Sequence, residues 1–169
     1  MKTRVIGLDP GLRRTGWGVI EVEGSSLAFL ASGTVGTDNM LPLASRLSQI
    51  FEGLLKVISK FSPNTAAVEE TFVNRNPKST LKLGQARGVV LLAPAYSGVP
   101  VAEYSATVIK KSIVGAGHAH KDQVQAMIKV LLPRARPNTI DEADALAVAV
   151  CHVHHSERQE LNFSRKRPL

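Results

Sequence analysis

The chain has 169 residues, a net charge of +7 and a hydrophobic fraction of 44%, which are typical of a single globular domain. Its one cysteine excludes an internal disulfide framework, and no apolar run reaches the roughly 18 residues that cross a bilayer, so we expect a soluble, cytoplasmic protein with no membrane partner. The positive charge is concentrated in residues 71–140, where ten Lys and Arg side chains accompany only two acids, as expected of a protein that binds a phosphate backbone.

The first part of the chain is predicted to form three strands, a helix and a fourth strand. Alternating, β-branched residues predict two antiparallel hairpins built from residues 4–8, 15–22 and 27–37. Gly16 and Gly18 indicate that another backbone approaches the second strand closely. Apolar residues three and four apart predict a helix over residues 41–61, which Pro63 ends, and a short buried strand follows at 65–69.

The remainder is predicted to be mostly helical. Helical spacing of apolar residues predicts helices over 79–96, 108–114 and 121–132, with a fifth strand at 99–103. The last helix begins near Thr139, because Thr139 and Glu142 match a capping box. From Arg158 onward the pattern ends in basic residues, so we expect a domain of residues 1–157 and a mobile tail of 158–169. This order favours an α/β fold: a five-stranded mixed β-sheet flanked by α-helices.

Four carboxylates stand at the ends of predicted elements. Asp9 closes the first strand and Glu69 the fourth; if these strands are parallel neighbours, both side chains emerge at one edge of the sheet, where ligand sites collect. Asp141 and Asp144 share one face of the last helix, and His152, two turns further on, is expected in the core or behind the site. Clustered carboxylates raise one another's pKa unless a cation is present, and Mg²⁺ is usual with phosphate substrates.

Each carboxylate taken singly also has a structural explanation. Asp9 precedes a common turn, Glu69 fits a solvated strand end, Asp141 complements a helix dipole and Asp144 fits a lysine pair. The four together favour a metal site, in which two ions would promote in-line hydrolysis of a phosphodiester.

Four segments resemble the RuvC family of bacterial Holliday-junction resolvases: GLDPGLRRTGWG (7–18), AVEETF (67–72), STLKLGQARG (79–88) and DEADALA (141–147). The resemblance covers about residues 3–155. It implies an RNase H-like fold and a homodimer that nicks two opposed strands of a four-way DNA junction in recombination and DNA repair, leaving ligatable 5′-phosphate and 3′-hydroxyl ends. It also implies Mg²⁺ as cofactor, with Mn²⁺ as a substitute, and the RuvA–RuvB branch-migration complex as partner.

The resemblance also assigns roles to residues. The family's metal-binding, catalytic carboxylates are matched by Asp9, Glu69, Asp141 and Asp144. Phe72, otherwise a core residue at a strand end, matches an aromatic that stacks on junction bases, an interaction worth roughly 1–3 kcal/mol. Lys110 and Lys121 match lysines beside the scissile phosphate. Residues 79–88 resemble the dimer-forming helix. Further DNA-binding residues are expected to be Arg75, Lys78, Lys82 and Arg87.

Two other functions fit parts of the sequence: an RNase H-like nuclease of the YqgF type acting on RNA, and a junction-binding module that does not cleave. Phe72 and the lysine pair argue against the first. The four carboxylates argue against the second, because clustered negative charge gains nothing in binding DNA. An actin-like ATPase fold is too large for this chain. Pro77 departs from the family pattern and is expected either to start its helix early or to alter the preceding loop.

Overall fold

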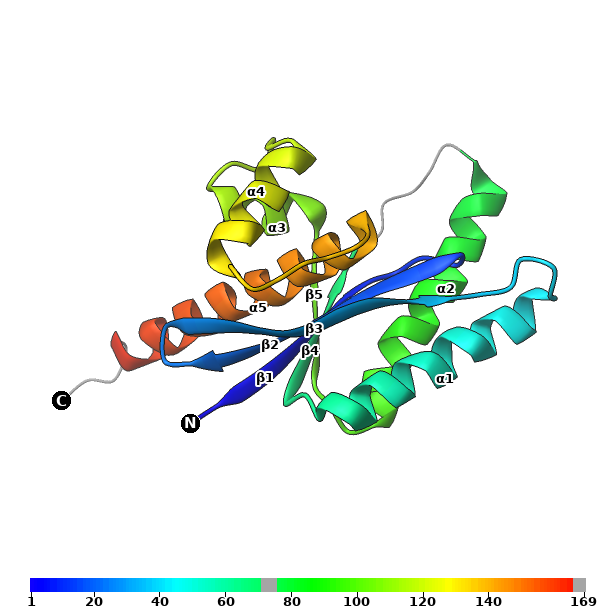
Figure 1. The fold of residues 1–169 in the computed structure, drawn as a ribbon, viewed down its shortest axis with the longest axis horizontal. Coiled ribbons are helices and arrows are strands. Elements are labelled where there is room, and N and C mark those ends of the chain that lie inside the picture. The colour runs from blue at the N-terminus through cyan, green and yellow to red at the C-terminus, as the bar shows by residue number, and fades with distance from the viewer. Residues whose placement is uncertain (71–75, 166–169) are drawn as a thin grey trace.

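The computed structural model describes residues 1–70 and 76–165, with side chains described as far as Ser156. One five-stranded sheet in the order β3-β2-β1-β4-β5 carries helices on both faces (Figure 1). The strands are β1 (Thr3–Asp9), β2 (Arg14–Glu23), β3 (Ser26–Gly36), β4 (Thr65–Glu69) and β5 (Val101–Tyr104). The helices are α1 (Leu43–Phe61), α2 (Pro77–Tyr96), α3 (Ala106–Val114), α4 (Lys121–Leu131) and α5 (Ile140–Arg165). The expected α/β fold with a mixed sheet is confirmed.

The sheet is antiparallel on one side and parallel on the other. Strands β1, β2 and β3 form the two predicted hairpins, whereas β1 pairs in parallel with β4, and β4 with β5. The register of β1 on β4 runs from Val5 opposite Thr65 to Leu8 opposite Val68. The next residue of each strand is therefore an acid, so the two strands bring acidic side chains to the same carboxyl edge, as the sequence predicts.

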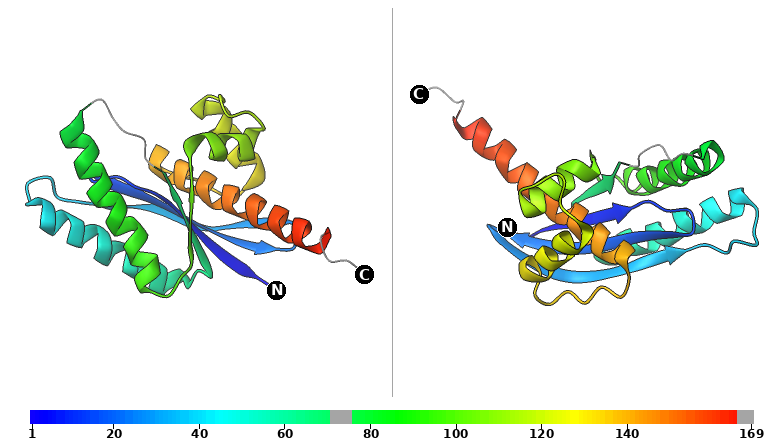
Figure 2. Two further views of the ribbon diagram at one scale, coloured as in Figure 1. Left: turned by 180° about the vertical axis from the view of Figure 1, so that it is seen from behind. Right: turned by 90° about the horizontal axis from the view of Figure 1, so that it is seen from above.

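The two faces of the sheet hold separate apolar clusters. Ile6 and Leu8 of β1 pack toward α1 and α2, whereas Val5 belongs to the cluster formed with α3, α4 and α5. Figure 2 shows this three-layer arrangement from behind and from above. Side chains alternate along a strand, so Gly7 and Asp9 lie on the α5 face with Val5. The Asp9 side chain at the end of β1 therefore points toward the face of the sheet that α5 covers.

Helix α5 lies directly on the backbone of β1 and β2. A methyl group added at Gly7 would lie 2.0 Å from the carbonyl oxygen of Ala145, and one at Gly16 would lie 2.1 Å from that of Asp141. Gly18, opposite Gly7 in the pairing of the two strands, faces the side chain of Leu146, whose Cδ2 would lie 2.7 Å from an added methyl group. The close approach expected at Gly16 and Gly18 is confirmed, and Gly7 extends it to β1. The contact sets the first turns of α5 over the end of β1.

The start of α5 is held by a buried glutamate. The backbone N–H of Glu142 donates to Thr139 Oγ1 at 3.2 Å, which confirms the first half of the predicted capping box. The Glu142 side chain accepts from the Thr139 hydroxyl, through Oε1 at 3.3 Å, where a capping box would have the backbone N–H of Thr139 as donor. The other carboxylate oxygen, Oε2, accepts a hydrogen bond of 2.7 Å from Ser32 Oγ on β3. Glu142 is only 4% exposed, so these bonds satisfy a carboxylate that is out of contact with water.

A second polar contact holds α5 two turns beyond Asp144. His152 lies in the core, as expected, and hydrogen-bonds through Nε2 with Thr65 Oγ1 at 3.1 Å and through Nδ1 with the Tyr104 hydroxyl at 2.9 Å. Burial lowers the pKa of this imidazole. The neutral ring therefore links α5 to β4 and β5.

Some boundaries differ from the predicted ones for local reasons. Helix α2 begins at Pro77 rather than residue 79, because the Asn76 side chain accepts hydrogen bonds from the N–H groups of Lys78 and Ser79 and proline suits the first helical position. Helix α5 continues to Arg165, past the point near Arg158 where the sequence pattern ends. No helix within the described residues is long and apolar enough to cross a bilayer.

Gly7→Ala should destabilise the protein by about 1–3 kcal/mol, because the added methyl group would overlap the backbone of α5. Urea denaturation followed by circular dichroism measures the change. Gly36→Ala, at a position with nothing within 4 Å, serves as the control and should stay close to wild type. Equal stability of the two variants would contradict the direct contact of α5 with β1.

Candidate active site

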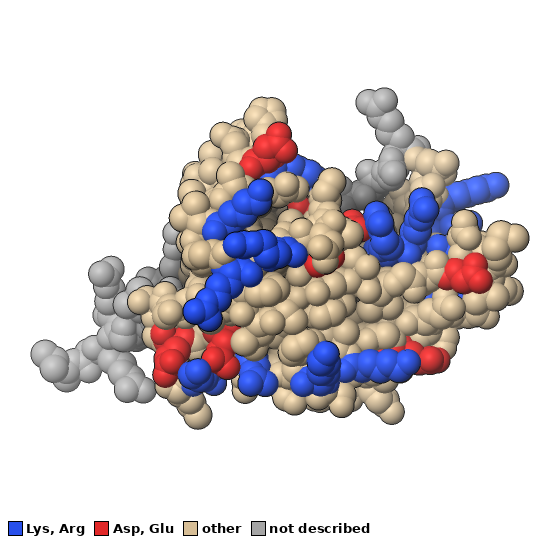
Figure 3. Space-filling model, viewed as in Figure 1, with Lys and Arg blue, Asp and Glu red and all other residues tan. Residues whose placement is uncertain are grey.

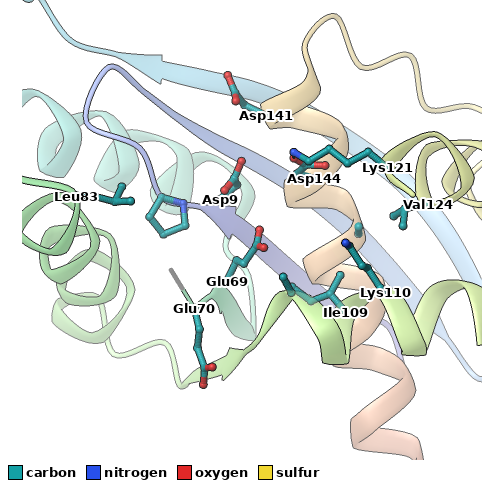
Figure 4. A pocket seen from close by; sticks show the side chains of 13 residues that line it. Asp9, Glu69, Glu70, Leu83, Ile109, Lys110, Lys121, Val124, Asp141 and Asp144 are labelled. Carbon is teal, nitrogen blue, oxygen red and sulfur yellow. The ribbon is translucent and has the colours of Figure 1, made fainter. Parts of the chain in front are cut away.

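A pocket of about 380 Å³ lies at the carboxyl edge of β1 and β4, beside the first turns of α5. Its lining includes every candidate carboxylate and both candidate lysines: Asp9, Glu69, Asp141, Asp144, Lys110 and Lys121. Figure 4 shows these side chains around the pocket, with Leu83 of α2 on the opposite side. The structure therefore brings together six residues that the sequence places on five separate elements.

The end of β1 is fixed by a tight turn that follows Asp9. A methyl group at Gly11 would lie 2.2 Å from the carbonyl oxygen of Arg14, so only glycine fits this turn without a shift of the backbone. Thr15, fully buried, donates its hydroxyl proton to the carbonyl of Gly11 at 2.9 Å. The turn leads straight into β2 and leaves the Asp9 side chain at the edge of the pocket.

The carboxylates in this pocket interact strongly. Burial raises the pKa of the Asp9 carboxyl from 3.8 to about 8, and the negative charges of the three other carboxylates add to the rise. Burial and the charge of Asp144 also raise the pKa of Glu69, against the opposing effect of Lys121 and Lys110. The pocket thus carries more negative charge than its own lysines compensate, which is the condition that a bound cation would relieve.

Two of the carboxylates are engaged in ion pairs. Lys121 Nζ lies 2.9 Å from Asp144 Oδ2, and this hydrogen bond raises the pKa of the lysine. Arg14 Nε, at the start of β2, lies 3.1 Å from Asp141 Oδ2. In Figure 4 the Asp141 side chain points away from Glu69. Asp141 and Asp144 are therefore both bound to cationic side chains of the protein itself.

The donor set fits a hard divalent cation, since it consists of carboxylate oxygens around a pocket with excess negative charge. Within the described ranges, no group of three or more His, Cys, Asp or Glu side chains converges closely enough to hold an ion. Two of the four carboxylates, Asp141 and Asp144, are bound to Arg14 and Lys121 instead.

Three other predicted DNA-binding residues, Lys78, Lys82 and Arg87, are not among the residues that line the pocket. Lys78 and Lys82 are exposed on α2, whereas Arg87 forms an ion pair with Glu103 of β5. Figure 3 shows Lys and Arg side chains gathered on the α4 side and the α2 side of one face, with acidic side chains between them. Two predicted residues, Phe72 and Arg75, lie outside the described residues.

Arg14 is the site residue that sequence reasoning misses. It stands beside Arg13 in a basic pair, and nothing in the sequence distinguishes the two. Its importance depends on the tertiary contact between β2 and α5.

Comparison with known proteins identifies the family. Residues 5–152 match the family model for the crossover junction endodeoxyribonuclease RuvC. A RuvC from Xanthobacter autotrophicus is 65% identical over 152 residues, 90% of each chain, and one from Afipia carboxidovorans is 58% identical over 163 residues, 96% of this chain and 94% of the relative.

The fold agrees with solved structures of the same family. Thermus thermophilus RuvC matches with a TM-score of 0.84 and 35% identity over 93% of this chain and 97% of that one. The T. thermophilus RuvC solved in complex with a Holliday junction substrate gives a TM-score of 0.87 and 34% identity, over 93% and 96% of the two chains. Since its sequence and its fold both agree with those of the relatives, the chain belongs to the RuvC family of crossover junction endodeoxyribonucleases.

Proposed function

We propose that this chain resolves Holliday junctions by hydrolysing one phosphodiester in each of two opposed strands. The observation that carries the proposal is the pocket that gathers four carboxylates and two lysines, in a chain of the RuvC family. The complex of T. thermophilus RuvC with a Holliday junction substrate supports a four-way junction as the substrate. The products would keep a 5′-phosphate and a 3′-hydroxyl, which a ligase can join in recombination and repair.

In this proposal Asp9, Glu69, Asp141 and Asp144 hold Mg²⁺, two ions for each active site, and Mn²⁺ can substitute. When bound, the ions supply a water of lowered pKa and neutralise the charge that develops on the phosphate. That positive charge would keep Asp9, whose pKa is about 8, ionised at neutral pH. Asp141 and Asp144 would leave their ion pairs to take part.

Lys110 and Lys121 are proposed to bind the scissile phosphate. Both line the pocket, on α3 and at the start of α4, and both lower the pKa of Glu69, so their positive charge reaches the carboxylates. Once Asp144 is engaged elsewhere, the Lys121 ammonium group is free to donate to a phosphate oxygen. Outside the pocket, Lys78, Lys82 and Arg87 are proposed to contact the DNA, as are Arg75 and Phe72.

We also propose that the chain acts as a homodimer through α2, and that the RuvA–RuvB complex is its partner. Leu81 and Leu92 of α2 are 66% and 52% exposed, and a methyl group added at Gly84 or Gly88 would meet nothing within 4 Å. At intervals of three and four these four residues form one apolar stripe with room for a second helix. A two-fold axis there would relate two active sites, as cleavage of two strands requires.

The test is cleavage of a synthetic mobile four-way junction and of a matched linear duplex, with Mg²⁺ or with EDTA. Symmetric nicks are expected on the junction alone and should disappear with EDTA. Asp9→Asn should lose at least about a hundredfold in cleavage rate while retaining junction binding in a gel-shift assay, because it removes a proposed ligand and not a contact to DNA.

Other outcomes would favour other functions. Tight binding of the junction without cleavage by the wild type would indicate a binding module. Cleavage of RNA instead of the junction would indicate a nuclease of the YqgF type.

Asp9→Asn should also stabilise the metal-free protein at neutral and alkaline pH. A carboxyl with a higher pKa in the folded state binds more protons there, so stability falls as the pH rises from 3.8 to about 8. The variant avoids this loss, and its melting midpoint in EDTA should exceed that of wild type by a few degrees at pH 8 but by little at pH 4, since about 1 kcal/mol corresponds to roughly 2–4 °C. A difference independent of pH would contradict the raised pKa. Added Mg²⁺ should reduce the difference in melting midpoint between the variant and wild type at pH 8.

Leu81→Glu should convert the dimer into a monomer, because it places a charge in the centre of the proposed interface. Analytical ultracentrifugation measures the mass, and an increase of at least tenfold in the dissociation constant is expected. Val130→Glu, on a 70% exposed residue of α4, is the matched control and should remain dimeric. Dissociation of both variants, or of neither, would exclude α2 as the interface.

A further inference from the structure

Arg14 is a charged residue beside the pocket to which the family resemblance gives no role. Its Nε lies 3.1 Å from Asp141 Oδ2, and the two side chains keep 55% and 29% of their exposure. The pair is therefore solvated on one side. An ion pair of this kind contributes only about 0–1 kcal/mol and exchanges partners easily.

The contact between the backbones of β2 and α5 brings Arg14 and Asp141 together. Arg14 precedes Gly16 by two residues on β2, so both lie on the face of the strand that α5 covers. Gly16 is in contact with the carbonyl of Asp141, where a methyl group would lie 2.1 Å from the oxygen. The Arg14 side chain therefore starts beside the first turn of α5, within reach of the Asp141 carboxylate.

The pair has a consequence for the carboxylate cluster. Asp141 lines the pocket, but its side chain points away from Glu69 (Figure 4). It forms an ion pair with Arg14 instead. Among the described residues, no three potential ligands converge on one cation. Joining the other carboxylates would require the Asp141 side chain to turn from its present direction, in which Oδ2 is bound to Arg14.

We propose that Arg14 is a positioning residue, which holds Asp141 out of the metal site in the free protein and releases it by taking a DNA phosphate in its place. The inference rests on the proposed function. A phosphate competes well for this side chain, because a guanidinium binds phosphate through two parallel hydrogen bonds. Arg14 is exposed and is paired with a residue that lines the pocket, so a strand laid across the pocket would pass close to it. Substrate binding and completion of the metal site are thereby coupled through one side chain.

The first experiment measures binding of Mn²⁺ to the DNA-free protein by isothermal titration calorimetry. Arg14→Gln should bind Mn²⁺ about two- to fivefold more tightly than wild type, the range that a half-exposed ion pair allows. Arg14→Lys keeps the charge and should stay near wild type. Arg13→Gln removes one charge from an exposed neighbour that pairs with no acid among the described residues, so it should have the smaller effect.

A double-mutant cycle separates the contact from general electrostatics. In an Asp141→Asn background, Arg14→Gln should leave Mn²⁺ binding unchanged, because its effect acts through that carboxylate. Circular dichroism of each variant confirms that it is folded. An unchanged or weaker Mn²⁺ affinity in Arg14→Gln, or an equal gain in Arg13→Gln, would overturn the proposal.

The second experiment tests the phosphate. Junction binding is measured in EDTA at several salt concentrations, and log Kd is plotted against log [salt]. The slope for Arg14→Gln should be smaller than that of wild type by about 0.9, because the variant has lost one phosphate contact. An unchanged slope would overturn the exchange. These experiments distinguish failure of this proposal from failure of the proposed function. If the wild-type protein neither binds Mn²⁺ nor cleaves the junction, the nuclease function is rejected. If the wild-type protein is active and the Arg14 variants bind Mn²⁺ and the junction as it does, only the role of Arg14 is rejected.

Discussion

The whole site depends on the direct contact between α5 and the backbone of β1 and β2. Helices usually pack on sheets through a layer of side chains, which keeps the two backbones well apart. Here Gly7 and Gly16 remove that layer, so that carbonyl groups of α5 lie against the strands themselves, and Gly18 leaves room for the Leu146 side chain. Only at this short separation can carboxylates from a helix share one pocket with carboxylates from two strand ends. The glycines thus contribute to the chemistry without touching the substrate.

Much of this arrangement follows from local sequence rules. The parallel pairing that unites Asp9 and Glu69, and the Thr139–Glu142 cap, are recognisable because each depends on residues close together in sequence or on strand order. The partners of these elements were not predictable. Ser32 donates a hydrogen bond to Glu142 from a strand more than a hundred residues away in sequence. Arg14 lies close enough to pair with Asp141 only because the backbones of β2 and α5 are in contact at Gly16. Such contacts are properties of the tertiary packing.

The pocket holds several carboxylates and must also bind DNA, which is a polyanion that these carboxylates repel. The basic excess of residues 71–140 offsets this repulsion, because that segment forms α2, α3 and α4 around the acidic edge of the sheet. Within the pocket the compensation is local: Lys121 pairs with Asp144, and Arg14, from a different part of the chain, pairs with Asp141. Each of these cations is also proposed to bind a phosphate.

The hydrogen bonds at the two ends of the buried part of α5 fix its axial register. Ser32 holds Glu142 in the first turn, and Thr65 and Tyr104 hold His152 three turns later. A slip of one residue would move every side chain by 1.5 Å and turn it by about 100°, which would carry both aspartates off the pocket. Because these hydrogen bonds prevent the helix from sliding or rotating about its axis, the site can rearrange only by rotation about side-chain bonds, while the backbone stays in place.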